Sequence, residues 1–309
     1  MKIQRCIVPI LTVTLGAANF AIAASNPGGA VTTQMVVTLL PGANGIRPDN
    51  LAAGELAVTQ GKTPARVIQL QRMAGELADM QLYILLDDST RSSSVGLQLR
   101  DLKAALTSLP ASTQVAIGYM RNGTAAIAQP FTADHGKAAS ALRLPLGVPG
   151  ENGSPYFALK DLAQHWPSKE PSNRRAVLML TDGVDRYYEA AIVDDPYVDT
   201  AIRDALKQGV MVYSIYLRGA GQYGRSGRAT NLAQSRLLEV SEQTGGYAYF
   251  EGFTDPVSIA PFLKDLQDRL DHQYKAAIEV TSGKGVQPVK VRSEMPGLKI
   301  DAPTRIYVR

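Results

Sequence analysis

The sequence predicts an α/β protein with a doubly wound, mostly parallel sheet, helices on both faces of that sheet, and β-rich segments at the N- and C-terminal ends. Short apolar runs such as residues 82–86 alternate along the central part of the chain with segments whose apolar residues recur at helical spacing. This alternation is typical of a parallel sheet that helices cover on both sides. The composition is that of a globular protein, because 45% of the 309 residues are hydrophobic and 19% are charged.

The N-terminus has the layout of a secretory signal peptide. Two basic residues precede an apolar stretch at 7–18, and small residues stand at Ala21 and Ala23. We expect cleavage after Ala23, so that residues 1–23 are the signal. A membrane anchor is the less favoured alternative, because the apolar stretch is shorter than the ~20 residues that span a bilayer. The sequence therefore predicts a secreted or periplasmic protein with no stable membrane span after cleavage.

Cysteine and charge content exclude several classes of protein. The one cysteine, Cys6, lies within the expected signal, so the mature chain has no disulfide and no cysteine-ligated metal. The formal charge of +4 falls to about +2 (4 − 2) when Lys2 and Arg5 leave with the signal. No run of basic residues interleaved with aromatic residues is present, so we expect no nucleic-acid partner.

The N-terminal segment, residues 24–78, is expected to be β-rich. Residues 31–41 contain many β-branched side chains and end at a Pro-Gly pair, which indicates a strand. Residues 55–72 indicate two short strands joined at Gly61. The C-terminal segment, residues 274–309, again shows short alternating strands. We expect the two segments to pack together as a small accessory module.

Residues 79–273 are expected to form one central domain. Buried strands are indicated at 80–88, 174–182 and 210–218, and a last short strand at 247–252. The Arg-Asn-Gly sequence at 121–123 is a hairpin signal between two further strands, which adds one antiparallel edge strand. The expected helices lie at 96–109, 133–146 in its first part, 154–166, 197–209, 231–246 and 256–274.

Residues that favour helix ends support these boundaries. Ser154 is a candidate N-cap, and Pro155 stands at the first helical position, where its missing N–H costs nothing. Gly209 and Gly245 follow two of the expected helices, as glycines that end helices commonly do.

The candidate site lies at the carboxyl ends of the buried strands. Asp87 and Asp88 end one strand, and Asp182 ends another. In an open parallel sheet, ligands bind at this edge, so the carboxylates are expected to converge on one crevice. Serine hydroxyls at Ser89 and Ser154 add neutral oxygen atoms, and an oxygen-only donor set suits Mg²⁺. The alternative is that these side chains only cap the strands and the helices that follow.

The motifs around these residues resemble the von Willebrand factor type A family, in its bacterial and acidobacterial form. The sequence Leu-Leu-Asp-Asp-Ser-Thr-Arg-Ser-Ser resembles the first loop of the family's metal-ion-dependent adhesion site, and Ala-Val-Leu-Met-Leu-Thr-Asp-Gly resembles its third loop. The resemblance implies a Rossmann-like central domain between a β-segment and a closing β-extension. It also implies a metal site in which Asp87 and Ser89 match the first loop, Ser154 stands where the family has threonine, and Asp182 matches the third loop.

Arg91 departs from the pattern, because it stands where the family has its second ligand serine. A guanidinium is a permanent cation that suits carboxylates. If it turned inward, Arg91 would supply the charge that Mg²⁺ otherwise brings; if it turned outward, Ser92 or Ser93 would take over as ligand. We therefore expect a degenerate site that binds Mg²⁺ weakly or not at all.

Other chemistries are less well supported. An Mg²⁺-dependent hydrolase or phosphotransferase of haloacid-dehalogenase type is an alternative, but the second acid of its motif is misplaced. The glycine pattern at 219–224 is that of a dinucleotide site, but it comes late and stands apart from the next helix. No nucleophile motif or zinc spacing is present, and the histidines at 135, 165 and 272 lie in unrelated segments.

These observations predict a secreted, non-enzymatic binding or adhesion-type protein. Its partner is expected to be another protein, bound through the crevice at the strand ends and the loops around it. The alternatives are an Mg²⁺-dependent enzyme that uses the same acidic crevice and a structural envelope component with a dead site.

Overall fold

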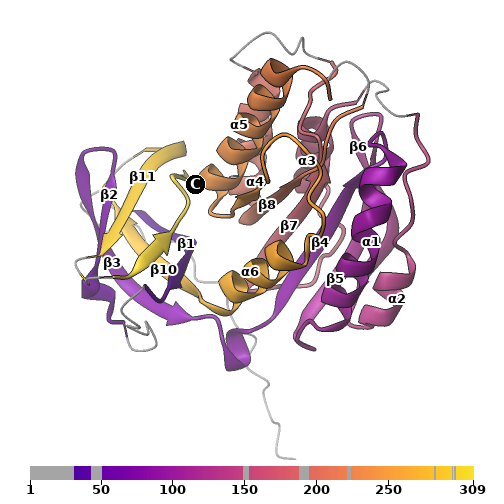
Figure 1. Cartoon of the computed structure of the whole chain (residues 1–309). Helices are drawn as coiled ribbons and strands as arrows, with labels where there is room; N and C mark the ends of the chain where they lie inside the picture. The colour runs from indigo at the N-terminus through magenta and orange to yellow at the C-terminus, as the bar shows by residue number, and fades with distance from the viewer. Residues whose placement is uncertain are drawn as a thin grey trace, which may run out of the picture.

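The computed structural model describes residues 31–42, 51–148, 153–187, 195–220, 224–281, 283–293, 295 and 297–309. The expected signal peptide, residues 1–23, lies outside the described residues. The described chain forms two sheets that lie side by side, one curled and one covered by helices (Figure 1).

The larger sheet has seven strands in the order β12-β1-β10-β3-β2-β11-β13, and every pairing within it is antiparallel. It joins the N-terminal strands to the C-terminal ones, since β10 lies between β1 and β3. Its core is formed by alternate residues such as Tyr274, Ala276 and Ile278 on β10, which face Val37 and Leu39 of β1. Its strands are β1 (Val31–Leu40), β2 (Leu56–Gln60), β3 (Thr63–Arg72), β10 (Gln273–Val280), β11 (Gly285–Ser293), β12 (Lys299–Asp301) and β13 (Arg305–Val308).

The second sheet has six strands in the order β6-β5-β4-β7-β8-β9, and it is mixed. Strands β5, β4, β7, β8 and β9 run parallel, while β6 pairs antiparallel with β5. The turn between β5 and β6 has positive φ at Asn122 and Gly123, as a two-residue hairpin requires, so the predicted hairpin is confirmed. The strands are β4 (Met80–Asp87), β5 (Thr113–Arg121), β6 (Thr124–Thr132), β7 (Arg174–Thr181), β8 (Val210–Tyr216) and β9 (Ala248–Tyr249).

The predicted fold class is wrong for the chain as a whole. Among the described strand pairs, seven are antiparallel and four are parallel, and the sheet with more strands is the antiparallel one. The chain is therefore not a doubly wound, mostly parallel α/β protein with β-rich flanks. The physical reason is that the terminal strands have alternating apolar residues, which give them a core of their own rather than a place beside a parallel sheet.

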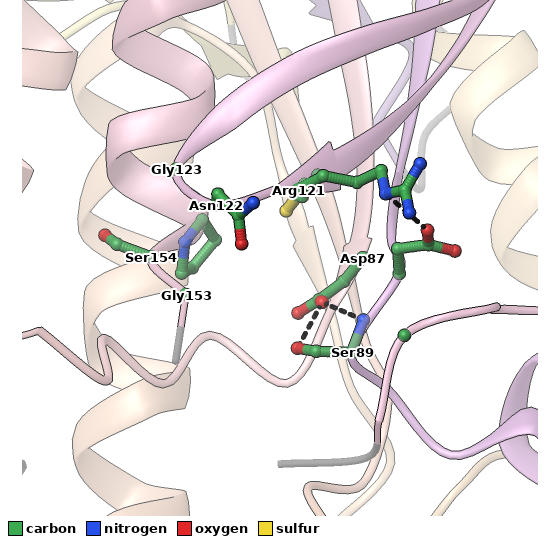
Figure 2. A pocket seen from close by; sticks show the side chains of 11 residues that line it. Asp87, Ser89, Arg121, Asn122, Gly123, Gly153 and Ser154 are labelled. Carbon is green, nitrogen blue, oxygen red and sulfur yellow. Dashed lines mark hydrogen bonds and ion pairs between the residues drawn. The ribbon is translucent and has the colours of Figure 1, made fainter. Parts of the chain in front are cut away.

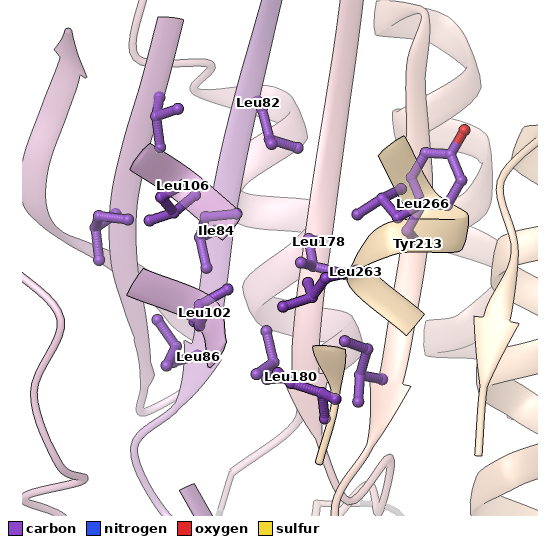
Figure 3. Close-up of a cluster of buried hydrophobic side chains, with 14 of the residues drawn as sticks. Leu82, Ile84, Leu86, Leu102, Leu106, Leu178, Leu180, Tyr213, Leu263 and Leu266 are labelled. Atoms are coloured by element: carbon purple, nitrogen blue, oxygen red, sulfur yellow. The ribbon is translucent and has the colours of Figure 1, made fainter. Parts of the chain in front are cut away.

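Two hydrophobic clusters hold the helices against the mixed sheet. One contains residues of α1 and α6, including Leu102, Leu106, Leu263 and Leu266, packed on alternate residues of β4 and β7 (Figure 3). The other contains residues of α3, α4 and α5, packed on the other face of the sheet against the intervening residues of β4 and β7. The helices are α1 (Ser92–Thr107), α2 (His135–Ser140), α3 (Pro155–Gln164), α4 (Pro196–Gln208), α5 (Gly227–Thr244) and α6 (Ala260–Asp271).

Helix ends follow their sequence signals. Ser154 is the N-cap of α3 and accepts a hydrogen bond from the Phe157 N–H at 3.2 Å, with Pro155 in the first turn. Gly209 and Gly245 end α4 and α5 with φ of 66° and 85°. Helix α1 begins at Ser92, four residues before the predicted start.

The two sheets meet through polar contacts at the end of α6. Gln273 donates to the Tyr213 hydroxyl at 2.9 Å, and Arg174 donates to the Leu270 carbonyl at 2.7 Å and to Gln273 at 3.1 Å. Burial raises the pKa of Tyr213 to about 12. These buried contacts tie β8 and β7 of the mixed sheet to the start of β10 in the antiparallel sheet.

Candidate functional site

The predicted site residues come from the carboxyl ends of two adjacent parallel strands. Asp87 is the last residue of β4, and Asp182 directly follows β7. The register pairs Leu86 with Leu180, which places Asp87 beside Thr181. The Thr181 hydroxyl donates to Asp87 Oδ2 at 2.8 Å, so the two strand ends are joined at the site itself.

Asp87 is buried but surrounded by neutral donors. Its Oδ1 accepts hydrogen bonds from the Ser89 N–H at 2.9 Å and from the Ser89 hydroxyl at 2.7 Å. Together with Thr181, these donors solvate both carboxylate oxygens. Within the described chain, no lysine, arginine or histidine forms an ion pair with Asp87, so its negative charge has no cation in contact.

Asp182 has a permanent cation beside it. Arg186, four residues later, forms an ion pair with its carboxylate, and the two side chains are 2% and 0% exposed respectively. The Val184 N–H donates to Asp182 Oδ1 at 3.0 Å. Burial raises the pKa of Asp182, while the charge of Arg186 lowers it and that of Asp87 raises it. The pair thus neutralises one acid of the strand-end cluster from within the protein.

Ser154 reaches the cluster from the start of α3. Its hydroxyl donates to Asp185 Oδ2 at 2.7 Å, and Asp185 also accepts from the Tyr187 N–H at 2.8 Å. The Ser154 oxygen is therefore engaged on both sides, because it also caps α3.

Asp88 anchors a neighbouring loop rather than the crevice floor. Arg143 forms an ion pair with it at 2.7 Å, and Arg121 forms a second one at 3.3 Å. The Leu146 N–H donates to Asp88 Oδ1 at 2.9 Å. The Arg143 guanidinium also lies 3.6 Å from the centre of the Tyr119 ring, a cation–π contact. These contacts fix the 141–148 loop beside the strand ends.

A cavity of about 190 Å³ opens between these elements. Figure 2 shows Asp87 and Ser89 on one side of it, with Ser154 and Asn122 across from them. Asp182 is not part of its described lining and is fully buried. Its described lining consists of Asp87, Asp88, Ser89, Met120, Arg121, Asn122, Gly123, Gly147, Gly153, Ser154 and Pro155.

Arg91 does not enter the site. It is exposed at the position before α1 and does not cap that helix through its side chain. The residue that supplies the positive charge is Arg186, which the sequence analysis missed. The signal for it was available, because Thr-Asp-Gly-Val-Asp-Arg places an arginine four residues after Asp182. Arg121 and Arg143, which come from two other segments, were also missed, and so was Asp185 in the same loop as Asp182.

The donor set does not fit Mg²⁺. The metal would need carboxylate and hydroxyl oxygens around one centre. Here Asp182 is paired with Arg186, and the Ser154 hydroxyl donates to Asp185. Within the described residues, no group of three or more His, Cys, Asp or Glu side chains is arranged to hold a metal ion.

Exposed apolar side chains gather around the same edge of the mixed sheet. Of the ten large hydrophobic residues that are exposed in the described chain, eight lie on α1 near its start or on loops at the strand ends. The 250–257 loop is tied to α1 by Ser94, which donates to Asp255 at 2.7 Å, and by Gln98, which donates to the Pro256 carbonyl at 2.8 Å. We call these eight residues the apolar rim: Leu97, Leu144, Leu146, Val148, Tyr187, Phe250, Phe253 and Val257.

None of the described helices is long and apolar enough to cross a membrane.

Comparison with known proteins gives a distant similarity of structure alone. No family model and no curated protein sequence matches the chain. Among solved structures, it is similar to an aerotolerance-related membrane protein from Bacteroides fragilis that carries multiple mutations to serine, with 14% identity and a TM-score of 0.44 over 62% of this chain and 98% of that one. It is similar to the same degree, 14% identity and a TM-score of 0.44, to the conserved hypothetical protein BatB from Bacteroides thetaiotaomicron, over 61% of this chain and 96% of that one.

Proposed function

We propose that this chain is an exported, non-enzymatic protein that binds a protein partner through the Asp87 crevice and the apolar rim around it. The observation that carries the proposal is the gathering of eight of the ten exposed large hydrophobic side chains at this one edge. Exposed apolar side chains that are concentrated at one edge are costly in water and favour an interaction site. Export is proposed from the signal-like layout of residues 1–23.

The charge of the crevice favours a partner with a basic side chain. Asp88 and Asp182 each have arginine partners, whereas Asp87 has hydroxyl and amide donors only. A lysine ammonium from the partner would enter the 190 Å³ cavity and donate a charge-assisted hydrogen bond to the Asp87 carboxylate. The apolar rim would supply the desolvated contact area around that ion pair.

The relationship to von Willebrand factor A proteins forms part of this proposal and rests on the site residues alone. Asp87, Ser89, Ser154 and Asp182 keep the order of the adhesion-site motif, but Arg186 holds the acid that would help to bind a metal. We therefore propose binding that is independent of divalent cations.

The experiment compares partner capture by matched variants of the mature chain in an envelope extract. Leu146→Asp places a charge on the apolar rim, and Asp87→Asn removes the charge of the crevice. Ile127→Asp on β6 and Asp268→Asn on α6 are the controls, because both residues are exposed away from the site. The expected result is a protein that the wild type and both controls capture, with and without EDTA, and that both site variants lose.

Two outcomes would reject this function. If all variants captured the partner equally, the crevice and the apolar rim would not be the binding site. If EDTA abolished capture, binding would depend on a divalent cation. The competing hydrolase or phosphotransferase is tested separately with phosphoester substrates: Mg²⁺-dependent turnover that Asp87→Asn abolishes would favour the enzyme. A chain with neither capture nor turnover would fit a structural component with a dead site.

A further inference from the structure

A second cavity lies at the opposite edge of the mixed sheet from the Asp87 crevice. It has a volume of about 350 Å³ and lies between β1, β10 and β13 of the antiparallel sheet and the first residues of β7 and β8. We call it the inter-sheet groove. Its size falls within the range of roughly 300–1,000 Å³ in which proteins bind small molecules.

The polar part of the groove is basic. Arg175, Lys275, Arg305 and Arg309 line it, and none of its described lining residues is an aspartate or a glutamate. These four cations come from β7, β10, β13 and the residue that follows β13, so the fold brings them together from distant parts of the sequence. Four like charges around one cavity repel one another unless an anion lies among them.

Two carboxylates of neighbouring segments have partners of their own. Asp199 on α4 is 64% exposed and pairs with Arg305 at 3.1 Å. Asp79 accepts hydrogen bonds from the backbone N–H and the side-chain amide of Asn173. Neither carboxylate belongs to the described lining of the groove, where Arg175 and Lys275 lie.

Within the part of the chain that the structure describes, no carboxylate forms an ion pair with Arg175. It is partly buried at the second position of β7, and its guanidinium lies 5.5 Å from the centre of the Trp166 ring. Burial lowers the pKa of Arg175, and among the described residues no carboxylate acts against this shift. Burial also lowers the pKa of the neighbouring Arg174, but there Tyr213, Asp79 and Asp271 oppose the shift.

The rest of the lining mixes apolar and neutral polar side chains. The apolar ones include Val36 of β1, Leu206 of α4 and Met211 of β8, and the polar ones include Gln34 and Asn173. A ligand with a charged group and an apolar body would find contacts for both parts in this lining.

We propose that the inter-sheet groove binds a phosphate monoester with an apolar body. The dianionic phosphate would lie between Arg175, Lys275 and Arg305, since guanidinium groups donate to phosphate oxygens in a bidentate geometry. The ester group would lie against Val36 and Leu206, which line the groove and are partly exposed. This site is independent of the protein-binding function proposed above, because the two lie at opposite edges of the mixed sheet.

The chain offers its own probe for this site, because Trp166 is its single tryptophan. The full chain is titrated with hexyl phosphate at constant ionic strength, and Trp166 fluorescence and calorimetric heat are both recorded. Hexyl phosphate is expected to give a saturable change. Inorganic phosphate is expected to bind more weakly because it lacks the alkyl chain. Hexanol is expected to give no change because it lacks the phosphate group.

Charge-removing variants test the residues. Arg175→Gln and Lys275→Gln are each expected to weaken hexyl phosphate binding about tenfold, which is the loss of one charge-assisted contact. Lys290→Gln, which removes the same charge from an exposed position on β11, is the control and is expected to bind as the wild type does. Lys275→Gln keeps the test valid if the partly buried Arg175 is needed for folding, which circular dichroism would show.

Two results would overturn the proposal. One is a dissociation constant for hexyl phosphate weaker than about 10 mM in the wild type. The other is equal weakening by Lys290→Gln, which would reduce the effect to net charge. A parallel arm uses vesicles that contain phosphatidic acid: binding lost in the same two variants would keep the phosphate chemistry and assign it to a lipid headgroup rather than a free monoester.

Discussion

The Arg186 guanidinium and the Asp182 carboxylate form an ion pair that the protein buries almost completely at the end of β7, with 2% and 0% of the side chains exposed. Both residues belong to the loop that follows the strand, so the chain supplies the counter-charge within four residues. The charge of nearby Asp87 raises the pKa of Asp182. Arg186 therefore supplies Asp182 with a positive charge from within the protein.

The first prediction concerns divalent cations. The wild type and Arg91→Ser are both expected to give no binding heat with Mg²⁺ or Mn²⁺, because Arg91 is exposed and Arg186 still holds Asp182. Isothermal titration calorimetry on both proteins checks this. Mg²⁺ binding by the wild type, abolished in Asp182→Ala, would contradict it, and so would a gain of binding in Arg91→Ser.

The second prediction concerns the stability of the same pair. Arg186→Met leaves Asp182 buried and uncompensated, so the free energy of unfolding is expected to fall by about 3–5 kcal/mol. The double variant Asp182→Asn/Arg186→Met removes both charges and is expected to recover part of that loss. Urea denaturation of the wild type, both single variants and the double variant gives the coupling energy. A coupling near zero would show that the pair does not stabilise the loop.

The third prediction concerns the loop that Asp88 holds. Arg143→Ala removes the ion pair at 2.7 Å, a hydrogen bond to the Leu144 carbonyl and the contact with Tyr119, so it is expected to lower stability by about 2 kcal/mol. It is also expected to open the 141–148 loop to proteases and to weaken partner capture. Arg121→Ala is the matched control, because Arg121 is 57% exposed and its pair with Asp88 is expected to contribute less than about 1 kcal/mol. Equal effects of the two variants would show that the loop does not depend on Arg143.

The strand ends and helix caps were predictable from local sequence because each depends on neighbouring residues. The hairpin at Asn122-Gly123, the N-cap at Ser154 and the glycine helix ends at 209 and 245 all follow from backbone geometry that few residues adopt. The nearness of Asp87 to the loop of Asp182 followed from adjacent parallel strands, but Asp182 does not line the described crevice as expected.

The fold class and the counter-ion of the site were not predictable in the same way. The antiparallel sheet pairs β1 with β10 and β2 with β11, which are more than 200 residues apart, and no local signal specifies such pairings. Likewise, the direction in which Arg91 or Arg186 turns depends on what is packed around it. The sequence placed Arg91 four residues after Asp87 and Arg186 four residues after Asp182, but it did not show which of the two contacts a site carboxylate.

The fourth prediction concerns alkaline pH. Burial raises the pKa of Tyr213 to about 12, from about 10 in the unfolded chain. A raised pKa gives stability that is fully present below pH 10 and is lost as the pH rises toward 12, because the unfolded tyrosine ionises first. Between pH 9 and 11, Tyr213 is expected to account for a loss of about 1.4 kcal/mol.

The test measures urea unfolding at pH 9 and pH 11. Tyr213→Phe is expected to lose about 1.4 kcal/mol less than the wild type between these two values, although it starts from a lower stability without the Gln273 hydrogen bond. Tyr187→Phe, at an exposed position, is the control and is expected to keep the loss of the wild type. A Tyr213→Phe variant with an unchanged loss would remove this residue from the alkaline transition.

The last prediction concerns the proposed division of the chain at residue 273. Deleting residues 274–309 removes four of the seven strands of the antiparallel sheet, including β10, which lies between β1 and β3. The buried faces of β1 and β3 would then be exposed, so we expect aggregation or rapid proteolysis within residues 31–72. The six strands of the mixed sheet keep both of their own hydrophobic clusters and are expected to stay folded. Limited proteolysis with mass spectrometry locates the first cuts, and deletion of residues 305–309 alone, which removes only the edge strand β13, is the control. If the long deletion melted and was cleaved like the intact chain, the N-terminal strands would not depend on the C-terminal ones, and the shared module would be rejected.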